Sequence, residues 1–432
     1  MLVKDVYVFV NIDVEEVLAG RVQHIREAGG DRYFFAYGRS YLTRSDAYSI
    51  DPRQLPLSEG VKVFPALPLA FQDAGPDDYG RYLYEVLHGR RPDSPLDCLL
   101  DSGSASIGAL SFSTNQQCPG PSRLVQTTSL EELAEAIGRL EAKKAVSEPM
   151  RRLLQPGSSL PGARPKALVV DQKGQQWIAK FSRPNDLFNI PAAEYAAMTA
   201  AGEMIDTAQV RLERIGQHDV FLTKRFDREH PHRHHFLSAY TLLGADQVTP
   251  DTFYQNFGYP AIAQLTKAVS DRPRQDAQEL YRRLAVNVML GNRDDHLKNH
   301  GFLKVPGANA YRLSPAYDIV PAAGGVTHAI GLDATTATAG LPVLLRTAAH
   351  FGITPEEATP ILEQASDLVD TMLDQAKGVG LGQEDLRLLE QGTLRYAGDR
   401  IERRGKEESD ELDLSQLDEL FSTPSHSPSH NR

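Results

Sequence analysis

The sequence predicts an α+β fold in which a β-rich N-terminal module precedes two lobes, the second of them largely helical. Three patterns support this prediction. Val6, Val8 and Val10 recur at every second position, the spacing of a half-buried strand. Residues 167–181 place two short apolar runs around a DQKG turn, as in a β-hairpin. Residues 275–290 carry apolar side chains at helical spacing.

Length and composition limit the class of protein. At about 150 residues per domain, a chain of 432 residues predicts two or three domains. The net charge of −11, from 46 basic and 57 acidic residues, argues against a protein that coats nucleic acid by charge alone. Two cysteines are too few for a secreted disulfide scaffold or a cysteine-rich metal cluster.

The chain also lacks the sequence marks of a membrane or exported protein. No apolar run approaches the roughly 18 residues that span a bilayer. The N-terminus carries four acidic residues within its first 16 positions and lacks the basic start and cleavage site of a signal peptide. We therefore expect a cytoplasmic protein with no membrane partner.

The pattern of elements divides the chain into five segments. Thr128–Lys143 has helical apolar spacing, with Ser129 placed to cap it. The end of the chain is acidic and then low in complexity, a composition typical of disorder. The predicted segments are a β-rich module (1–125), a linking helix (126–150), a first lobe with a flexible loop and a hairpin (151–235), a helical second lobe (236–404) and a disordered tail (405–432).

The remaining elements follow from the same rules of spacing and turn residues. We expect strands within 31–42, a strand–turn–strand at 210–226, and a hairpin of 301–305 and 311–313 joined by PGANA. Helices are expected at 15–21, 80–87, 192–201, 341–349, 355–375 and 384–400.

The strongest chemical signal is GNRDDHLKN at Gly291–Asn299, directly after the helix at 275–290. Such a loop suits phosphoryl transfer, in which an Asp orients the attacking hydroxyl and an Asn ligates magnesium, with four residues between them in protein kinases. Asp294 and Asn299 have this separation and Asp295 does not. We therefore predict Asp294 as the catalytic residue and Asp295 as structural. A polar loop that merely caps a helix is the simpler alternative.

A second candidate is Asp318 in the segment SPAYDIV, nineteen residues after Asn299. It follows the hairpin that leaves the first loop, which is where kinases place their second magnesium-binding Asp. The motif alone is weak, because an ordinary strand end would look the same. Its position is what favours a metal site.

The third piece is the hairpin at 167–181 and the loop before it. Gly157–Lys166 is rich in Gly and Ser, so its amides could hold phosphates, although it lacks the Walker pattern. Lys180 ends the strand segment WIAK, as the phosphate-binding Lys of a kinase does. A buried Lys needs an anion, and Glu194 on the next predicted helix is the best candidate. The alternative is an edge-strand Lys in solvent.

Taken in order, these pieces describe a bilobal kinase: a loop and a lysine hairpin, a helix, an Asp/Asn loop, and a hairpin followed by an Asp. We interpret two other motifs as structural. HPHRHH at 230–235 is expected to be a solvent loop, not a metal site. GVGLG at 378–382 is expected to end a helix, not to bind a dinucleotide. His296 could either face phosphates or shape its loop.

The same residues resemble the HipA-type serine/threonine kinases of bacterial toxin–antitoxin systems. GALSF at 108–112 and DRYFFAYGRSYL at 31–42 resemble the extra N-terminal module of that family. The resemblance implies a two-lobed protein kinase that uses ATP and Mg²⁺. The matching motifs of the two lobes are SSLPGARPK (158–166), WIAKF (177–181), TKRFDR (223–228), GNRDDHLKN (291–299) and LSPAYDIV (313–320).

The resemblance also implies roles for individual residues. Asp294 is catalytic, and Asn299 and Asp318 hold magnesium. In the family the hinge often carries an acid where this chain has Lys224, which weakens only a side-chain role there. The residues implied to bind the nucleotide are Pro161, Gly162, Ala163, Arg164, Pro165, Lys166, Lys180, Lys224, Arg225, Phe226, His296, Lys298, Asn299, Tyr317 and Asp318.

Regulation and partners are implied in the same way. Ser159, or Ser158 beside it, is the expected site of an autophosphorylation that switches the kinase off. The expected partner is a HipB-like helix-turn-helix antitoxin, and the pair would bind operator DNA, mainly through the antitoxin, and repress its own operon. The expected substrate is a protein, and the family suggests an aminoacyl-tRNA synthetase.

Two alternatives remain open at this point. A small-molecule kinase can share the Asp-x4-Asn spacing, although the β-rich module and the SSLPGARPK loop favour the protein kinase. A non-catalytic co-repressor with a vestigial site is the other alternative. The presence of Lys180, Asp294, Asn299 and Asp318 together argues against it.

Overall fold

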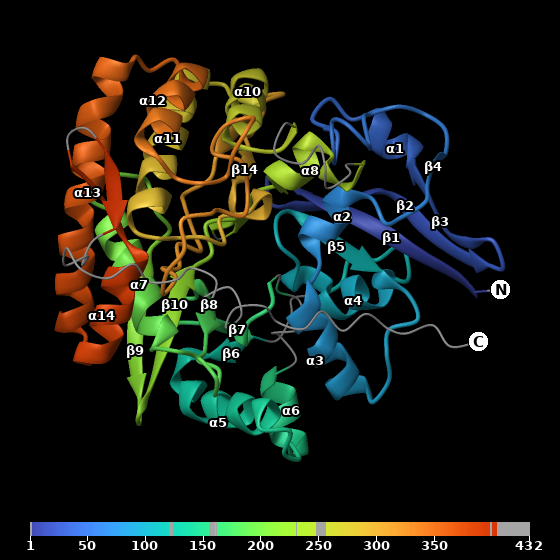
Figure 1. Cartoon of the computed structure of the whole chain (residues 1–432). Coiled ribbons are helices and arrows are strands. Elements are labelled where there is room, and N and C mark those ends of the chain that lie inside the picture. The colour runs from blue at the N-terminus through green and yellow to red at the C-terminus, as the bar shows by residue number, and fades with distance from the viewer. Residues whose placement is uncertain are drawn as a thin grey trace.

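The computed structural model shows an N-terminal module packed beside a two-lobed body (Figure 1). The predicted tail at 405–432 lies outside the described residues. No helix in the described part of the chain is long and apolar enough to cross a lipid bilayer. The structure describes residues 2–120, 124–154, 160, 162–229, 231–247, 256–397 and 400–403.

The N-terminal module is built on a five-stranded antiparallel sheet of order β4-β3-β2-β1-β5. Val6, Val8 and Val10 are fully buried in its core, as their alternation predicted. The strands are β1 (Leu2–Ile12), β2 (Glu15–Glu27), β3 (Gly30–Tyr37), β4 (Lys62–Phe64) and β5 (Leu110–Ser113), and the helices are α1 (Arg39–Leu42), α2 (Leu69–Ala74), α3 (Asp78–His88) and α4 (Pro95–Ser102).

The helix predicted at 15–21 is wrong, because this segment belongs to strand β2. Asp13 and Val14 both have positive φ angles, 42° and 72°, so the chain reverses in a two-residue hairpin turn. Residues 15–26 are thereby paired antiparallel with β1. Burial then follows the two-residue period of a strand, with Val17 and Ala19 facing the core.

The first lobe of the body is a second five-stranded sheet, of order β6-β7-β8-β10-β9, and it confirms the hairpins predicted at 167–181 and 210–226. Its helix α7 is apolar and almost entirely buried, and it packs between β10 and the second lobe. The strands are β6 (Val125–Gln126), β7 (Lys166–Val170), β8 (Gln176–Lys180), β9 (Val210–Ile215) and β10 (His218–Lys224), and the helices are α5 (Leu130–Glu141), α6 (Glu148–Leu154) and α7 (Ile190–Ala201). Ser129 is the N-cap residue of α5, as predicted, but its side chain makes no capping hydrogen bond, and a 3₁₀ turn leads into the helix.

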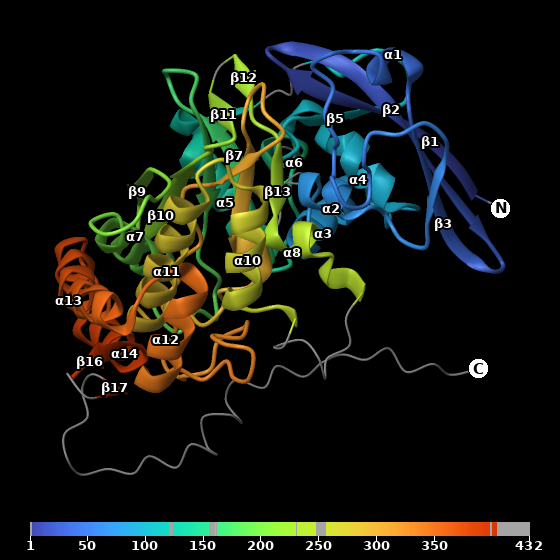
Figure 2. The same cartoon turned by 90° about the horizontal axis from the view of Figure 1, so that it is seen from above.

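The second lobe is mainly helical and encloses a small sheet of β13, β14 and β15. Its helices are α8 (Ala239–Leu243), α10 (Tyr259–Val269), α11 (Pro273–Met289), α12 (Leu341–Ala348), α13 (Pro355–Gly378) and α14 (Gln383–Gly392). Its strands, with the hairpin that precedes them, are β11 (Arg228–Glu229), β12 (His232–Arg233), β13 (Phe236–Ser238), β14 (Gly301–Lys304), β15 (Tyr311–Leu313), β16 (Leu394–Tyr396) and β17 (Ile401–Arg403). Seen from above, the N-terminal sheet and α13 lie at opposite ends of the molecule (Figure 2).

Two predictions in the C-terminal half of the chain need correction. The helix predicted at 384–400 ends at Gly392 and is followed by the β16–β17 hairpin. The carbonyl oxygen of Ala322 lies 1.7 Å from where a side chain on Gly392 would begin, so the chain makes a close backbone approach there. The HPHRHH segment is not simply a solvent loop, since β12 pairs with β11 and His235 is buried. The loop predicted at 378–382 does end a helix, α13.

Buried charges fasten the first lobe to the N-terminal module. The guanidinium of Arg225 is fully buried and donates to the carbonyl oxygens of Ala105 and Ser106, at 3.0 and 2.9 Å. Asp227 accepts from this guanidinium at 2.6 Å and from the amide of Gly108 at 2.8 Å. The segment that follows β10 is therefore held by the module on one side and by its own sheet on the other.

Candidate active site

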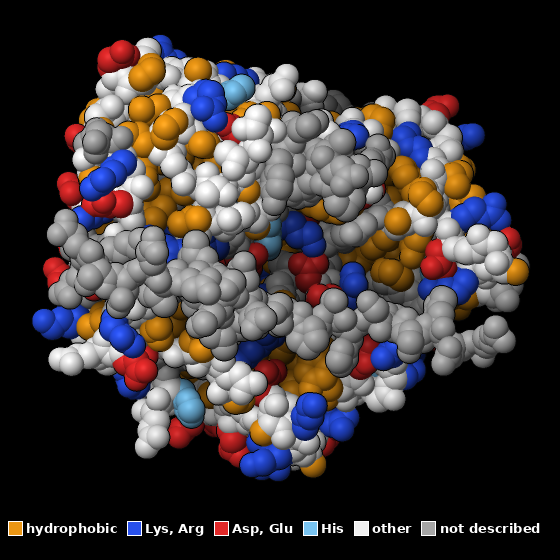
Figure 3. Space-filling view, in the orientation of Figure 1, with side chains coloured by type: hydrophobic (Ala, Val, Ile, Leu, Met, Phe, Trp, Pro, Cys, Tyr) orange, Lys and Arg blue, Asp and Glu red, His pale blue; other side chains and the backbone are white. Residues whose placement is uncertain are grey.

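A cleft between the second sheet, the segment after β10 and the loops around β14 gathers most of the predicted site residues. Figure 3 shows side chains of both charges, with a histidine, in the hollow at the centre of the face shown. Ala163, Arg164, Pro165 and Asp294 do not line this cleft, and Ser158, Ser159 and Pro161 lie outside the described residues. The predicted residues that line it are Gly162, Lys166, Lys180, Lys224, Arg225, Phe226, His296, Lys298, Asn299, Tyr317 and Asp318.

Lys180 lies at the centre of this arrangement. It ends strand β8, and its ammonium group is 2.5 Å from Glu194 Oε1 on helix α7, which confirms the predicted partner. The same ammonium group donates to Asp318. Burial would lower the pKa of Lys180, but the two carboxylates outweigh it and hold that pKa above its usual value. Burial raises the pKa of Glu194 to about 7 against the opposing effect of Lys180.

Asp318 has the backbone and the charge of a functional residue. Its φ angle is 62°, a left-handed conformation that costs energy in a residue other than Gly. Burial acts to raise its pKa, but the ammonium groups of Lys180 and Lys166 outweigh burial, and the pKa falls to about 2. The side chain is therefore a carboxylate near neutral pH, the form that binds a hard cation such as magnesium.

The loop after helix α11 separates its two carboxylates. Asp295 is buried, where it accepts from Tyr259 and lies 3.1 Å from His300 Nε2, so it belongs to the frame of the loop. Asp294 is exposed, and its pKa is raised by desolvation and by Asp318, with His296 opposing the shift. Asn299 Nδ2 donates to the carbonyl oxygen of Asp294 at 3.1 Å, which ties the two ends of the loop together.

The residues predicted to form the hinge divide between the cleft and the interface with the N-terminal module. The ring of Phe226 lies 5.4 Å from the ring of Tyr317, and both line the cleft, where they could contact a base. Lys224 donates its main-chain amide to Gln209 at 2.8 Å. Arg225 turns its guanidinium into the N-terminal module, and its main-chain amide donates to the carbonyl oxygen of Gln176 at 2.9 Å. Sequence reasoning could not show this direction.

The described part of the predicted nucleotide loop is anchored to the first lobe. Arg164 forms an ion pair with Asp186, and the carbonyl oxygen of Pro165 accepts from the Phe181 amide at 3.0 Å. Lys166 begins strand β7 and is buried. Burial, with Lys180 nearby, lowers the pKa of Lys166 to about 8. Lys166 and Lys180 thus place two amino groups at the end of the cleft that Gly162 borders.

Four residues of the N-terminal module also line the cleft and were missed by the sequence analysis: Gln72, Asp73, Asp77 and Ile107. Asp77 Oδ1 lies 2.7 Å from the ammonium group of Lys298, 221 positions further along the chain. No local pattern marks these residues, since ion pairs between distant segments leave no spacing signal. The N-terminal module is therefore a wall of the site as well as a neighbour of the body.

Comparison with known proteins decides the family. The model of the HipA-like C-terminal domain matches residues 158–373, half of the chain, and the model of the HipA N-terminal domain matches residues 10–113. This chain belongs to the HipA family. The two matches fall on the two-lobed body and on the N-terminal module.

A solved structure shows the same fold over nearly the whole of this chain. The HipA structure from Shewanella oneidensis MR-1, determined in a complex of that toxin–antitoxin system with HipB and operator DNA, aligns with a TM-score of 0.63. The alignment covers 90% of this chain and 94% of the other at 17% identity. The α+β, kinase-like HipA fold with its N-terminal module is thus the fold of this protein.

Two other relatives match a smaller part of this chain. Y4dM of Sinorhizobium fredii, whose name proposes it as a kinase, is 30% identical over 161 residues, which cover 34% of this chain and 37% of that relative. The Helicobacter pylori proinflammatory kinase CtkA aligns over 52% of this chain and 88% of its own at 12% identity, with a TM-score of 0.39. The match to Y4dM spans little more than a third of that relative's length.

Proposed function

We propose that this HipA-family chain is a serine/threonine-protein kinase that transfers the γ-phosphoryl group of ATP, with Mg²⁺, to a hydroxyl group of a protein. The observation that carries the proposal is the placement of Lys180 between Glu194 and Asp318, with the Asp294–Asn299 loop beside them. A buried lysine held by a helix carboxylate is how protein kinases orient the lysine that meets the nucleotide phosphates.

The residues of the cleft suit both ATP and Mg²⁺. Lys166, Lys180 and Lys298 line the cleft with cationic side chains for phosphates, and Phe226 offers an aromatic face for a base. Asp318 and Asn299 supply carboxylate and amide oxygens, the ligands that magnesium prefers. Magnesium, when bound, would neutralise charge on the phosphates.

We propose that Asp294 orients the hydroxyl group of the substrate and accepts its proton. Its carboxyl is exposed at the surface of the catalytic loop, where a serine or threonine of another protein can reach it. A carboxylate at this position can accept the proton of that hydroxyl as it attacks the phosphoryl group.

Identifying the molecule that accepts the phosphate distinguishes a protein kinase from a small-molecule kinase. The protein incubated with γ-labelled ATP and Mg²⁺ should label Ser or Thr in protein acceptors, including its own chain. Labelling of small metabolites with no protein labelling would instead support the small-molecule alternative. A chain with neither activity that still shifts operator DNA with its partner would support the co-repressor.

We further propose that this kinase is the toxin of a HipBA-type system. Its partner would be a HipB-like helix-turn-helix antitoxin, and the pair would bind operator DNA mainly through the antitoxin. The net charge of −11 favours that division of contacts, because phosphates are bound by basic surfaces. The substrate we propose is an aminoacyl-tRNA synthetase, which places the activity in the cytoplasm.

Asp318→Asn is expected to weaken magnesium-dependent ATP binding by about tenfold or more, because it removes one full charge from the metal site. Asn accepts a left-handed backbone nearly as well as Asp, so the conformation at φ 62° should persist. Calorimetric titration of ATP with and without Mg²⁺ measures the effect. Equal magnesium dependence in the wild type and the variant would remove Asp318 from the metal site.

Ser159 is expected to carry a phosphate after incubation with ATP and Mg²⁺, and the Asp294→Ala variant should carry none. A phosphate adds roughly −1.5 to −2 charges, which would repel the loop from the phosphates of ATP. Mass spectrometry locates the modification, with Ser158 as the neighbouring alternative. Modified protein that binds ATP as tightly as unmodified protein would leave the site but refute the switch.

A further inference from the structure

One carboxylate of the N-terminal module contacts both loops of the proposed active site. Asp77 Oδ1 lies 2.7 Å from Lys298 Nζ in the catalytic loop. Asp77 Oδ2 accepts from the amide of Gly162, in the nucleotide loop, at 3.2 Å. The carbonyl oxygen of Gly162 in turn accepts from the amide of Tyr79 at 3.4 Å. The start of helix α3 therefore holds the nucleotide loop at two points and the catalytic loop at one.

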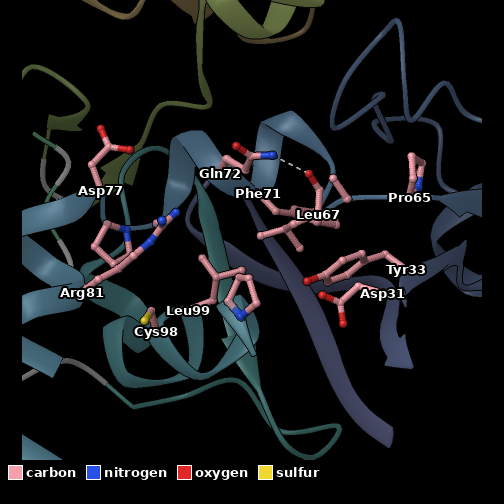
Figure 4. Close-up of a pocket in the computed structure, with 14 residues that line it drawn as sticks. Asp31, Tyr33, Pro65, Leu67, Phe71, Gln72, Asp77, Arg81, Cys98 and Leu99 are labelled. Atoms are coloured by element: carbon pink, nitrogen blue, oxygen red, sulfur yellow. Dashed lines mark hydrogen bonds between the residues drawn. The ribbon is translucent and has the colours of Figure 1, made fainter. Parts of the chain in front are cut away.

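The local structure explains why Asp77 can make these contacts. It is the N-cap residue of α3, yet its side chain makes no capping hydrogen bond, so its oxygens are directed away from its own helix. In Figure 4 its carboxyl group points away from the apolar side chains of Leu67 and Leu99, which line a separate pocket of about 230 Å³. Asp77 borders both that pocket and the cleft, so it lies in a thin wall between them.

We propose that Asp77 is a positioning residue of the active site, supplied by the N-terminal module. It fixes the amino group of Lys298 beside the phosphate end of the cleft and keeps Gly162 close to the catalytic loop. Asp77 acts through these two partners, not on the reacting atoms. The inference rests on the proposed phosphoryl transfer and adds to it a residue of the module that the kinase reaction requires.

Because Asp77 is negatively charged, its positioning role can be distinguished from a role in binding ATP. A carboxylate at the edge of a phosphate pocket repels the phosphates, so it should not increase the affinity for ATP. Its benefit lies in the orientation of Lys298 and of the loop when the phosphoryl group moves, and small misplacements at that stage cost rate. Loss of Asp77 should therefore lower kcat without weakening the binding of ATP.

Asp77→Asn tests this with Asp78→Asn as the matched control. Asp78 is the next residue along the chain, is exposed, and loses the same charge. We expect Asp77→Asn to lower kcat about tenfold, measured as autophosphorylation and phosphate release from ATP, with a Kd for Mg²⁺·ATP that is unchanged or lower. Asp78→Asn should leave both within about twofold. An unchanged kcat in Asp77→Asn, a Kd that rises in step with the loss of rate, or the same loss in Asp78→Asn would overturn the proposal.

A second measurement does not depend on catalysis. Asp77→Ala removes the acceptor of the Gly162 amide, so hydrogen exchange in a peptide that spans Gly162 should become faster, and Asp78→Ala should leave it unchanged. Unchanged exchange in Asp77→Ala would refute the contact itself. If the wild type transferred no phosphate from ATP to any protein, the proposed function would fail, yet this exchange test of Asp77 would still stand.

Discussion

Asp294→Asn is expected to reduce phosphoryl transfer about a thousandfold while leaving the urea unfolding midpoint almost unchanged. A positioned general base contributes roughly 10²–10⁴-fold, and Asn cannot accept the proton of the hydroxyl. Asp294 is exposed on its loop, and its carboxyl makes no hydrogen bond that would be lost within the described structure. The measurement is initial-rate transfer of labelled phosphate with each variant at equal concentration of folded protein.

Asp295→Asn provides the contrasting control. Asp295 is buried and is held by Tyr259 and His300, so its change should lower stability and leave more activity per folded molecule. An inactive but stable Asp295→Asn beside an active Asp294→Asn would mean that the Asp-x4-Asn register is wrong. The assignment of the base would then move by one residue.

Arg225→Met is expected to lower the free energy of unfolding by about 3–5 kcal/mol, because it leaves a buried carboxylate short of one partner. The Arg225 side chain is fully buried, and its loss also removes the donor to the Ala105 carbonyl oxygen. Urea denaturation followed by circular dichroism measures the change. The matched control is Arg312→Met, which breaks an exposed ion pair with Asp271 and should change the midpoint little.

Acid dependence gives the Arg225 prediction a second readout. Burial would raise the pKa of Asp227, but Arg225 and Arg228 outweigh it and hold that pKa well below its usual range. A carboxyl with a depressed pKa contributes stability above its unfolded pKa of about 4, and this stability is lost as the pH falls below that value. Arg225→Met should therefore lose less stability than the wild type between about pH 5 and pH 3. An equal loss in both would show that Arg225 does not set the charge state of Asp227.

Strong local patterns were enough for much of the fold and for the main motifs of the site. The hairpin at 167–181 and the helix at 275–290 were confirmed. Each depends on the spacing of apolar and turn residues within one short segment of the chain. The pairing of Lys180 with Glu194 could be inferred because a buried ammonium group requires a nearby anion and the next helix offered one. The order of the motifs along the chain pointed to the HipA family, and the family matches confirm it.

The errors came where a segment's structure depends on its neighbours. Residues 15–27 became a strand because the turn at Asp13 and Val14 returns the chain onto β1. The chain leaves helix α14 at Gly392, where the backbone of Ala322 comes too close for a side chain. Neither cause can be read from the periodicity of the segment itself.

By itself, the sequence determined the residue types, their spacing and therefore the chemistry available: a lysine, two carboxylates and an asparagine in the order typical of kinases. Only the tertiary structure decided which way the residues between the N-terminal module and the two lobes face. Arg225 turns from the hinge into the N-terminal module, and Asp77 reaches from that module to Lys298. Contacts between segments more than a hundred residues apart depend on how whole domains pack, and no local propensity encodes that packing.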